Sequence, residues 1–290
     1  MSRLFCFGLG YSAARIAAQL SEQGWHITGT ARTTDGAVAI AEQGYDAFIF
    51  DGTSPGEGIA EALAEATHVL ISAPPGDADP VLQHHVHDVR GAADLSWIGY
   101  LSTVGVYGDS GGNWIDETAP TDATSLRGRQ RIAAEAAWLA LGASMGVATQ
   151  VFRLAGIYGP GRSAIDRLCE GTAHRIIKPG QVFNRIHVDD IARTVCAAID
   201  QPAASQIYNV TDDEPGPPQD VVAFAAELLQ MPPPPEVPFV EAALSPMARS
   251  FYADNKRVSN KRLHQELGIA LKFPTYREGL RAIADARQPG

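Results

Sequence analysis

RLFCFGLGYSA, residues Arg3–Ala13, decides the fold of this chain of 290 residues. The apolar run Arg3–Phe7, bounded by glycine, predicts a buried strand, and Tyr11–Gln23, with alanines and a leucine at helical spacing, predicts a helix. Between them stands G-x-G-x-x-A, a variant of the glycine fingerprint that binds a dinucleotide at a helix N-terminus. The alternative is a turn that only packs the helix on the strand. We predict dinucleotide binding by Gly8, Leu9, Gly10, Tyr11, Ser12 and Ala13.

The ends of the next strands indicate which dinucleotide is bound. An NAD site places an acid after the second strand, whereas this chain has Arg32, which can pair bidentately with a 2′-phosphate. We therefore predict NADP(H) as the preferred cofactor, with NAD(H) as the alternative. For Arg32 itself, the alternative is a solvated loop residue. Asp51, after the third strand, is a candidate for the adenine edge or a turn residue. The backbone of Ser72 and Ala73, after the fourth strand, is a further candidate cofactor contact.

Outward from the glycine stretch, strands and helices alternate. The predicted strands that follow are His26–Thr30, Ala47–Phe50, His68–Ser72, Trp97–Ser102 and Thr149–Leu154. The predicted helices that follow are Gly36–Gln43, Gly58–Ala66, Val81–Ala92 and Arg127–Leu141. This alternation is typical of right-handed βαβ crossovers, and therefore of an α/β protein with a Rossmann-type doubly wound parallel sheet.

The pattern loosens in the second half of the chain. The predicted strands there are Arg175–Ile177, Phe183–Ile186 and Gln206–Val210, and the predicted helices are Asp189–Asp200, Gln219–Leu229, Ser259–Leu267 and Tyr276–Ala286. We expect residues 1–155 to form an NAD(P)-binding Rossmann domain. We expect residues 156–290 to form mostly a smaller α/β substrate lobe, from which a segment around residues 183–210 returns to the Rossmann sheet.

The composition disfavours several classes of protein. Apolar residues make up 45% and charged residues 19% of the chain, which is typical of a globular protein with a sizeable core. No apolar run approaches the roughly 18 residues that a membrane span needs. A net charge of −10 disfavours a nucleic-acid partner, so we expect a small-molecule substrate, with neither nucleic acid nor a membrane as partner.

The cysteines and histidines predict no metal site. Cys6, Cys169 and Cys196 are far apart and fit no metal-ligand spacing, which favours a reducing, cytoplasmic location. The cluster His84-His85-x-His87 does not complete a credible zinc site, because zinc needs further ligands at suitable spacing.

Several later segments resemble the extended short-chain dehydrogenase/reductases, the NAD-dependent epimerase/dehydratase form. Leu101–Asp109 (LSTVGVYGD) resembles the "SS-x-x-VYG" segment, and Trp114–Pro120 resembles "DE-x-x-P". Arg153–Arg162 is similar to "R-x-x-x-x-YGPG", Arg185–Asp190 to "hVdD", and Ile207–Val210 to "YNv". The resemblance implies a homodimer through the helices Val81–Ala92 and Arg127–Leu141.

The long helix departs from the family pattern of Tyr-x-x-x-Lys followed four residues later by Glu. Glu135 matches that glutamate, so Arg131 stands at the lysine position and Arg127 at the tyrosine position. No lysine precedes Lys178. The chain therefore resembles an atypical, YeeZ-like branch that has lost the tyrosine–lysine pair. Arginine stays protonated, so Arg127 is a poor general acid or base, while Arg131 could still hold ribose hydroxyls.

Other side chains are candidates for the chemistry. Ser102, Thr103 and Tyr107 are the predicted catalytic residues that contact the substrate oxygen. The predicted substrate-binding residues are Arg127, Arg153, Tyr158, Arg162, Arg185 and His187. The resemblance implies oxidoreductase, epimerase or dehydratase chemistry, and the arginines favour a small polar substrate that is anionic or nucleotide-sugar-like. The alternative function is a non-catalytic NAD(P)(H) sensor. The alternative role for Arg127 and Arg131 is to form ion pairs with nearby acids such as Glu135.

Overall fold

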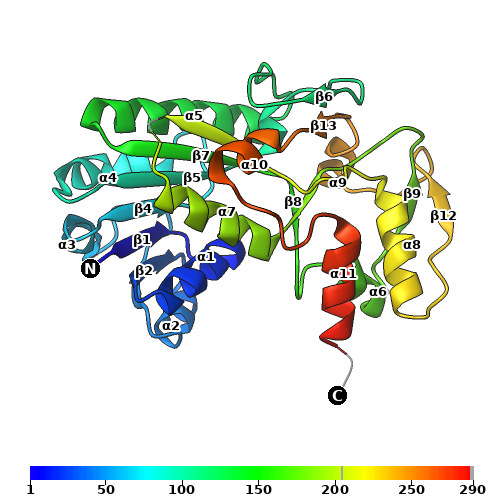
Figure 1. The fold of residues 1–290 in the computed structure, drawn as a ribbon, viewed down its shortest axis with the longest axis horizontal. Coiled ribbons are helices and arrows are strands. Elements are labelled where there is room, and N and C mark those ends of the chain that lie inside the picture. The colour runs from blue at the N-terminus through cyan, green and yellow to red at the C-terminus, as the bar shows by residue number, and fades with distance from the viewer. Residues whose placement is uncertain (204, 288–290) are drawn as a thin grey trace. The chain divides into compact units, whose positions relative to one another are not determined.

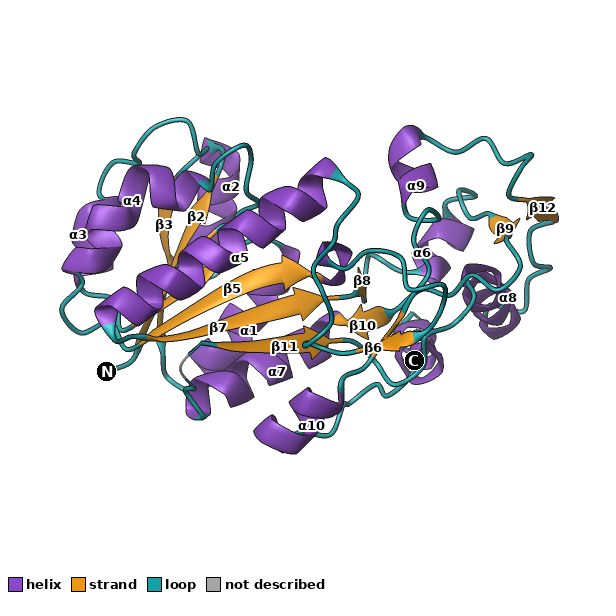
Figure 2. Cartoon of the chain, turned by 90° about the horizontal axis from the view of Figure 1, so that it is seen from above, coloured by secondary structure: helices purple, strands orange, loops and turns teal. Residues whose placement is uncertain are grey.

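The central element is a seven-stranded sheet in the order β3-β2-β1-β4-β5-β7-β11. The computed structural model describes residues 1–203 and 205–287. The strands are β1 (Arg3–Phe7), β2 (His26–Ala31), β3 (Asp46–Ile49), β4 (His68–Ile71), β5 (Trp97–Thr103), β7 (Ala148–Leu154) and β11 (Gln206–Val210). β1 pairs in parallel with β2 and β4, β2 with β3, and β4 with β5, and the arrows of β5, β7 and β11 point the same way (Figure 2). The predicted α/β class with a Rossmann-type parallel sheet is confirmed.

Helices cover both faces of this sheet. α1 (Tyr11–Glu22) and α7 (Val188–Asp200) lie on one face, while α3 (Ile59–Ala64), α4 (Pro80–Gly91) and α5 (Leu126–Met145) lie on the other (Figure 1). α2 (Thr34–Ala41) connects β2 to β3. Alternate residues of the strands, such as Phe5, Val69 and Ile98, form one core with Leu63 of α3 and Trp138 of α5. The inner strands β1, β4, β5 and β7 are therefore buried on both faces, as expected for parallel strands that are mostly apolar.

The chain divides into two compact units. The first consists of Met1–Val106, Asp122–Arg153 and Ile191–Tyr208, and the second of Tyr107–Thr121, Leu154–Asp190 and Asn209–Gly290. The segment Ile191–Tyr208 thus returns to the first unit after an excursion through the second.

The second unit has short strands in parallel pairs. They are β8 (Gly156–Tyr158) with β10 (Arg185–His187), β9 (Arg175–Ile177) with β12 (Glu236–Pro238), and β6 (Trp114–Ile115) with β13 (Arg257–Val258). Its helices are α6 (Ala164–Cys169), α8 (Pro218–Leu228), α9 (Pro246–Ser250), α10 (Lys261–Leu267) and α11 (Tyr276–Asp285). α6, α8 and α11 share a core with Tyr158.

Over the described ranges 1–203 and 205–287, no helix combines the length and the apolar character that crossing a bilayer requires.

Candidate functional site

The glycine turn after β1 has a backbone that only glycine adopts easily. Gly8 has φ +85°, in the left-handed region, and a Cβ built on it would stand 3.0 Å from the backbone nitrogen of Ala73. The N–H of Gly8 donates to Thr30 Oγ1 at 2.9 Å, and the N–H of Leu9 donates to the Thr30 carbonyl oxygen at 2.9 Å. The N–H of Gly10 donates to the Gly8 carbonyl oxygen at 2.8 Å. The turn is therefore fixed by contacts within the first unit.

The N-terminus of α1 is open to an anion. Gly10 is the N-cap residue, is exposed, and provides no side chain to cap the helix. The first intrahelical bond runs from the Ala14 N–H to the Gly10 carbonyl oxygen at 2.8 Å, and no acidic residue stands in the first turn. The first N–H groups of a helix lack intrahelical partners and carry the positive end of its dipole. The site therefore fits the pyrophosphate of a dinucleotide.

The backbone after β4 closes one side of the glycine turn. The N–H groups of Ser72 and Ala73 both donate to the Phe7 carbonyl oxygen, at 2.9 and 2.8 Å. This contact holds the end of β4 against the end of β1. The predicted cofactor contact of Ser72 and Ala73 remains a prediction, and their N–H groups are already used.

Arg32 and Asp51 lie in the loops that follow β2 and β3. Arg32 is exposed, and none of the described residues forms an ion pair with its guanidinium. Asp51 is also exposed, and its Oδ1 accepts hydrogen bonds from the N–H and the hydroxyl of Thr53, both at 2.8 Å. These hydrogen bonds hold the pKa of Asp51 below its usual value. Asp51 thus has the geometry of a turn residue, and its contact with adenine stays a prediction.

Glu135 of α5 joins two of the predicted site residues in the interior of the first unit. Its Oε1 accepts the hydroxyl of Ser102 at 2.5 Å, and its Oε2 accepts Arg153 Nη2 at 2.7 Å. Arg153 Nε lies 3.2 Å from both carboxylate oxygens. Glu135 and Arg153 are each 4% exposed. Glu135 therefore pairs with Arg153, not with Arg127 or Arg131.

The two arginines at the tyrosine and lysine positions differ in their surroundings. Arg131 donates through Nη1 to the Leu101 carbonyl oxygen at 2.5 Å and to the Tyr100 hydroxyl at 3.3 Å. Arg127, one turn earlier on α5, is exposed. Thr103, at the end of β5, accepts the N–H of Gly105 through Oγ1 at 3.0 Å. Arg131 thus attaches α5 to the end of β5.

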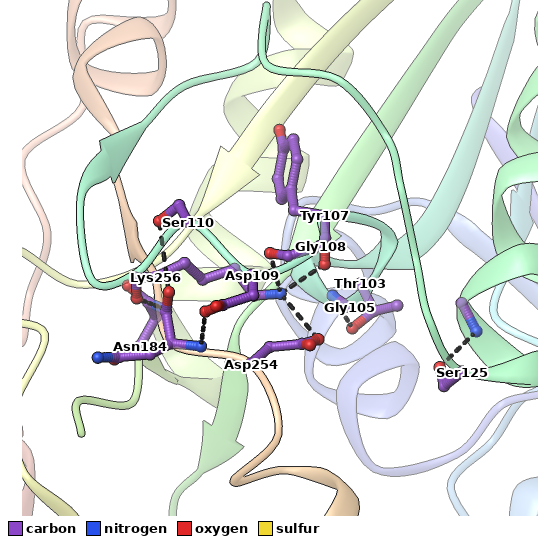
Figure 3. A network of polar contacts seen from close by, with 12 residues as sticks. Thr103, Gly105, Tyr107, Gly108, Asp109, Ser110, Ser125, Asn184, Asp254 and Lys256 are labelled. Carbon is purple, nitrogen blue, oxygen red and sulfur yellow. Dashed lines mark hydrogen bonds and ion pairs between the residues drawn. The ribbon is translucent and has the colours of Figure 1, made fainter.

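Tyr107 belongs to the second unit, where its ring and its backbone make separate contacts. Its hydroxyl donates to Asn209 Oδ1 at 2.8 Å, and the side chain is 1% exposed. Lys256 donates to the carbonyl oxygens of Tyr107 and Gly108, at 2.5 and 3.0 Å, while the Tyr107 ring points away from it (Figure 3). Burial lowers the pKa of Lys256. The contact with a substrate oxygen remains a prediction for Tyr107.

Three of the predicted substrate-binding residues lie together in the second unit. The ring of His187 packs edge-on against Tyr158, with centroids 5.2 Å apart, and both side chains are buried. Arg185 donates through Nη1 to the carbonyl oxygens of Phe183 and Gly216, at 2.9 and 3.0 Å. Burial raises the pKa of Tyr158 and lowers that of Arg185.

Arg162 is placed differently from these three. Arg162 is exposed and lies in a turn, where the backbone N–H of Gly159 donates to the Arg162 carbonyl oxygen and the N–H of Arg162 donates to that of Gly159.

Four residues in these contacts were not singled out as site candidates from the sequence. Thr30 holds the glycine turn, Glu135 holds Ser102 and Arg153, Asn209 accepts the Tyr107 hydroxyl, and Lys256 holds the backbone after Tyr107. Glu135 had a sequence signal in its spacing from Arg131. The other three meet their partners through contacts between residues 22 to 149 positions apart, which no local pattern reveals.

Comparison with known proteins gives three kinds of similarity. The model of the NAD dependent epimerase/dehydratase family matches residues 81–211. The protein YeeZ of Escherichia coli K12 is 27% identical over 220 residues, which cover 72% of this chain and 77% of YeeZ. A solved structure of a functionally unknown conserved protein from Silicibacter pomeroyi is 47% identical, with a TM-score of 0.89, and covers 99% of this chain and 100% of that one.

A more distant structure shows the fold alone. It is dTDP-glucose 4,6-dehydratase from Bacillus anthracis in complex with NAD, which is 16% identical with a TM-score of 0.78 and covers 98% of this chain and 96% of its own.

Proposed function

We propose that this chain, which belongs over residues 81–211 to the NAD dependent epimerase/dehydratase family and is a homologue of YeeZ, binds a nicotinamide dinucleotide. We propose further that it prefers NADP(H). The observation that carries the proposal is the glycine turn. Gly8 lies so close to the backbone directly after β4 that a Cβ would stand 3.0 Å from Ala73 N, and the exposed Gly10 has no side chain to cap the start of α1. Such a helix start binds phosphate groups through N–H donors and its dipole.

The test is a titration of the purified protein with NADPH and NADH, followed by the fluorescence of the reduced nicotinamide and of tryptophan. We expect saturable binding of NADPH and weaker binding of NADH. If neither cofactor binds, the proposal of a dinucleotide site is wrong.

Arg32 supports the preference for NADP(H). Its guanidinium is exposed directly after β2 and has no ion-pair partner among residues 1–203 and 205–287. Replacing Arg32 with alanine should weaken NADPH binding by about 10- to 100-fold, because a hydrogen bond to a charged group contributes about 1.5–3 kcal/mol. Binding of NADH, which lacks the 2′-phosphate, should stay within about twofold. Equal losses for both cofactors in the titration would contradict the role of Arg32.

We propose redox, epimerase or dehydratase chemistry on a small polar substrate that is anionic or nucleotide-sugar-like. Bound nicotinamide would supply hydride transfer. The Thr103 hydroxyl accepts the Gly105 N–H, and no described residue accepts its proton, so it can donate to a substrate oxygen. The exposed Arg127, at the start of α5, supports a negatively charged substrate.

A second candidate function is a non-catalytic NAD(P)(H) sensor. Two specific contacts favour it: the Ser102 hydroxyl donates to Glu135, and the Tyr107 hydroxyl donates to Asn209, so both protons are already held within the protein. Loss of the reduced-nicotinamide absorbance with any of a panel of phosphorylated and nucleotide-linked sugars would establish the enzyme. Tight cofactor binding without turnover over that panel would favour the sensor.

We propose a homodimer through α4 and α5. Ala133, Ala136, Ala137 and Ala140 leave one face of α5 exposed and flat, and a hollow of about 420 Å³ lies beside it against the start of α4. Small residues allow two helices to approach closely. Sedimentation should give twice the monomer mass of 30.8 kDa, and Ala137→Arg should give the monomer. A wild-type monomer at micromolar concentration would contradict the dimer.

We also propose a cytoplasmic location. Cys6, Cys169 and Cys196 are all free thiols, which a reducing compartment maintains.

A further inference from the structure

Thr30 of β2 holds the glycine turn through two hydrogen bonds. It is 1% exposed, its Oγ1 accepts the Gly8 N–H, and its carbonyl oxygen accepts the Leu9 N–H, both at 2.9 Å. We infer that Thr30 is a positioning residue, which sets the orientation of the turn that binds the dinucleotide phosphates. This inference rests on the proposed dinucleotide site, and it adds a residue that would not touch the cofactor itself.

The side chain of Thr30 is needed because the strand ladder ends before the turn. β1 and β2 pair from Arg3 with His26 to Cys6 with Gly29. Beyond that pair the chain turns at Gly8, and its N–H has the Thr30 hydroxyl as acceptor in place of a backbone carbonyl. The Gly8 N–H is partly buried, and loss of its acceptor destabilises the conformation that shields it from water. Without the hydroxyl, the Gly8 peptide would therefore rotate to find another acceptor.

Rotation at Gly8 would carry over to the helix. The Gly8 carbonyl oxygen accepts the Gly10 N–H at 2.8 Å, and the Gly10 carbonyl oxygen accepts the first intrahelical bond from Ala14 at 2.8 Å. The N–H groups of Gly8, Leu9 and Gly10 all donate within the protein. The candidate donors to a phosphate are the N–H groups of Ser12 and Ala13 in the first turn of α1, and their direction depends on this chain of contacts from Thr30.

Three variants separate this role from simple packing. Thr30→Val keeps the shape of the side chain and removes the acceptor, while Thr30→Ser keeps the hydroxyl. Thr28→Val is the matched control, because Thr28 lies two residues earlier on β2, is 7% exposed, and stands opposite Phe5 within the ladder. Residues two apart on a strand share a face of the sheet, so both valines replace a buried threonine in the same way.

The experiment measures NADPH affinity and the hydrogen exchange of the Gly8 and Leu9 amides for all four proteins. We expect Thr30→Val to weaken NADPH binding about tenfold and to speed exchange at Gly8, with both restored within about twofold in Thr30→Ser. Thr28→Val should change neither. Equal binding by Thr30→Val and the wild type, or an equal loss in Thr28→Val, would overturn the role of Thr30.

The two readouts also keep this inference apart from the proposed function. If the wild type binds no dinucleotide, the proposed function is wrong. The exchange measurement then still decides whether Thr30 orients the turn: unchanged exchange at Gly8 in Thr30→Val contradicts it.

Discussion

Replacing Glu135 with alanine is expected to lower the free energy of unfolding by about 3–5 kcal/mol, since removing one partner of a buried ion pair takes the counter-ion from the other. Arg153 is 4% exposed and has Glu135 as its carboxylate partner through Nε and Nη2. The same substitution removes the acceptor of the Ser102 hydroxyl. A loss of this size is a large fraction of the stability of a typical protein, which is about 5–15 kcal/mol.

Denaturant unfolding of two further variants shows whether the loss comes from the buried ion pair. Glu65→Ala is the control, because Glu65 pairs with Arg3 at 2.8 Å, but both side chains are well exposed, and an exposed pair contributes about 0–1 kcal/mol. The double variant Glu135→Leu/Arg153→Met removes both charges and should recover much of the loss, because apolar replacement of a buried pair is often neutral. A loss for Glu135→Ala no larger than that for Glu65→Ala would contradict the buried pair.

Replacing Gly8 with alanine is expected to weaken NADPH binding by at least about 100-fold, through a cost of about 3 kcal/mol or more in the turn. Two effects add. An alanine at φ +85° is strained, and its Cβ would lie 3.0 Å from the backbone nitrogen and 3.3 Å from the Cα of Ala73. Backbone at the end of β4 cannot move aside as a flexible side chain can, so the turn itself must shift.

Gly24→Ala is the matched control for this prediction. Gly24 has φ +82°, and a Cβ there meets no atom within 4 Å. The substitution therefore imposes the same backbone strain without the contact, after the end of α1. Its thermal stability should fall modestly while NADPH affinity stays at the wild-type value in the titration. If Gly8→Ala binds NADPH as well as Gly24→Ala does, the phosphates do not lie at the glycine turn.

The first unit could be predicted from the sequence because its signals are local. Arg3–Phe7 and Gln206–Val210 are strands with the predicted bounds, and Tyr11–Gln23 is helical to Glu22. In the second unit the predicted strand Phe183–Ile186 is found at Arg185–His187. The two-residue strands β6 and β13 were missed, because each is defined by a partner more than 140 residues away along the chain.

The site was predictable only in part, for the same reason. Gly8 and Arg32 follow from their positions at strand ends, which a sequence displays directly. The partners of Arg153 and Tyr107 do not, since Glu135 and Asn209 reach them from other elements. A sequence shows that an arginine or a tyrosine is present in a given segment. It does not show whether the polar atoms of that side chain are already satisfied.

The first unit is assembled from three separate stretches of the chain, so its sheet cannot be completed in one step as a new chain leaves the ribosome. β11 lies at the edge of the sheet beside β7, yet it is made only after residues 154–190, which belong to the other unit. Until Gln206–Val210 has emerged, β7 presents an open edge with unpaired N–H and C=O groups, the kind of edge that templates aggregation. Completion of the sheet is therefore a late event in biosynthesis, and a ribosome that pauses between residues 154 and 205 would prolong the exposure of this edge.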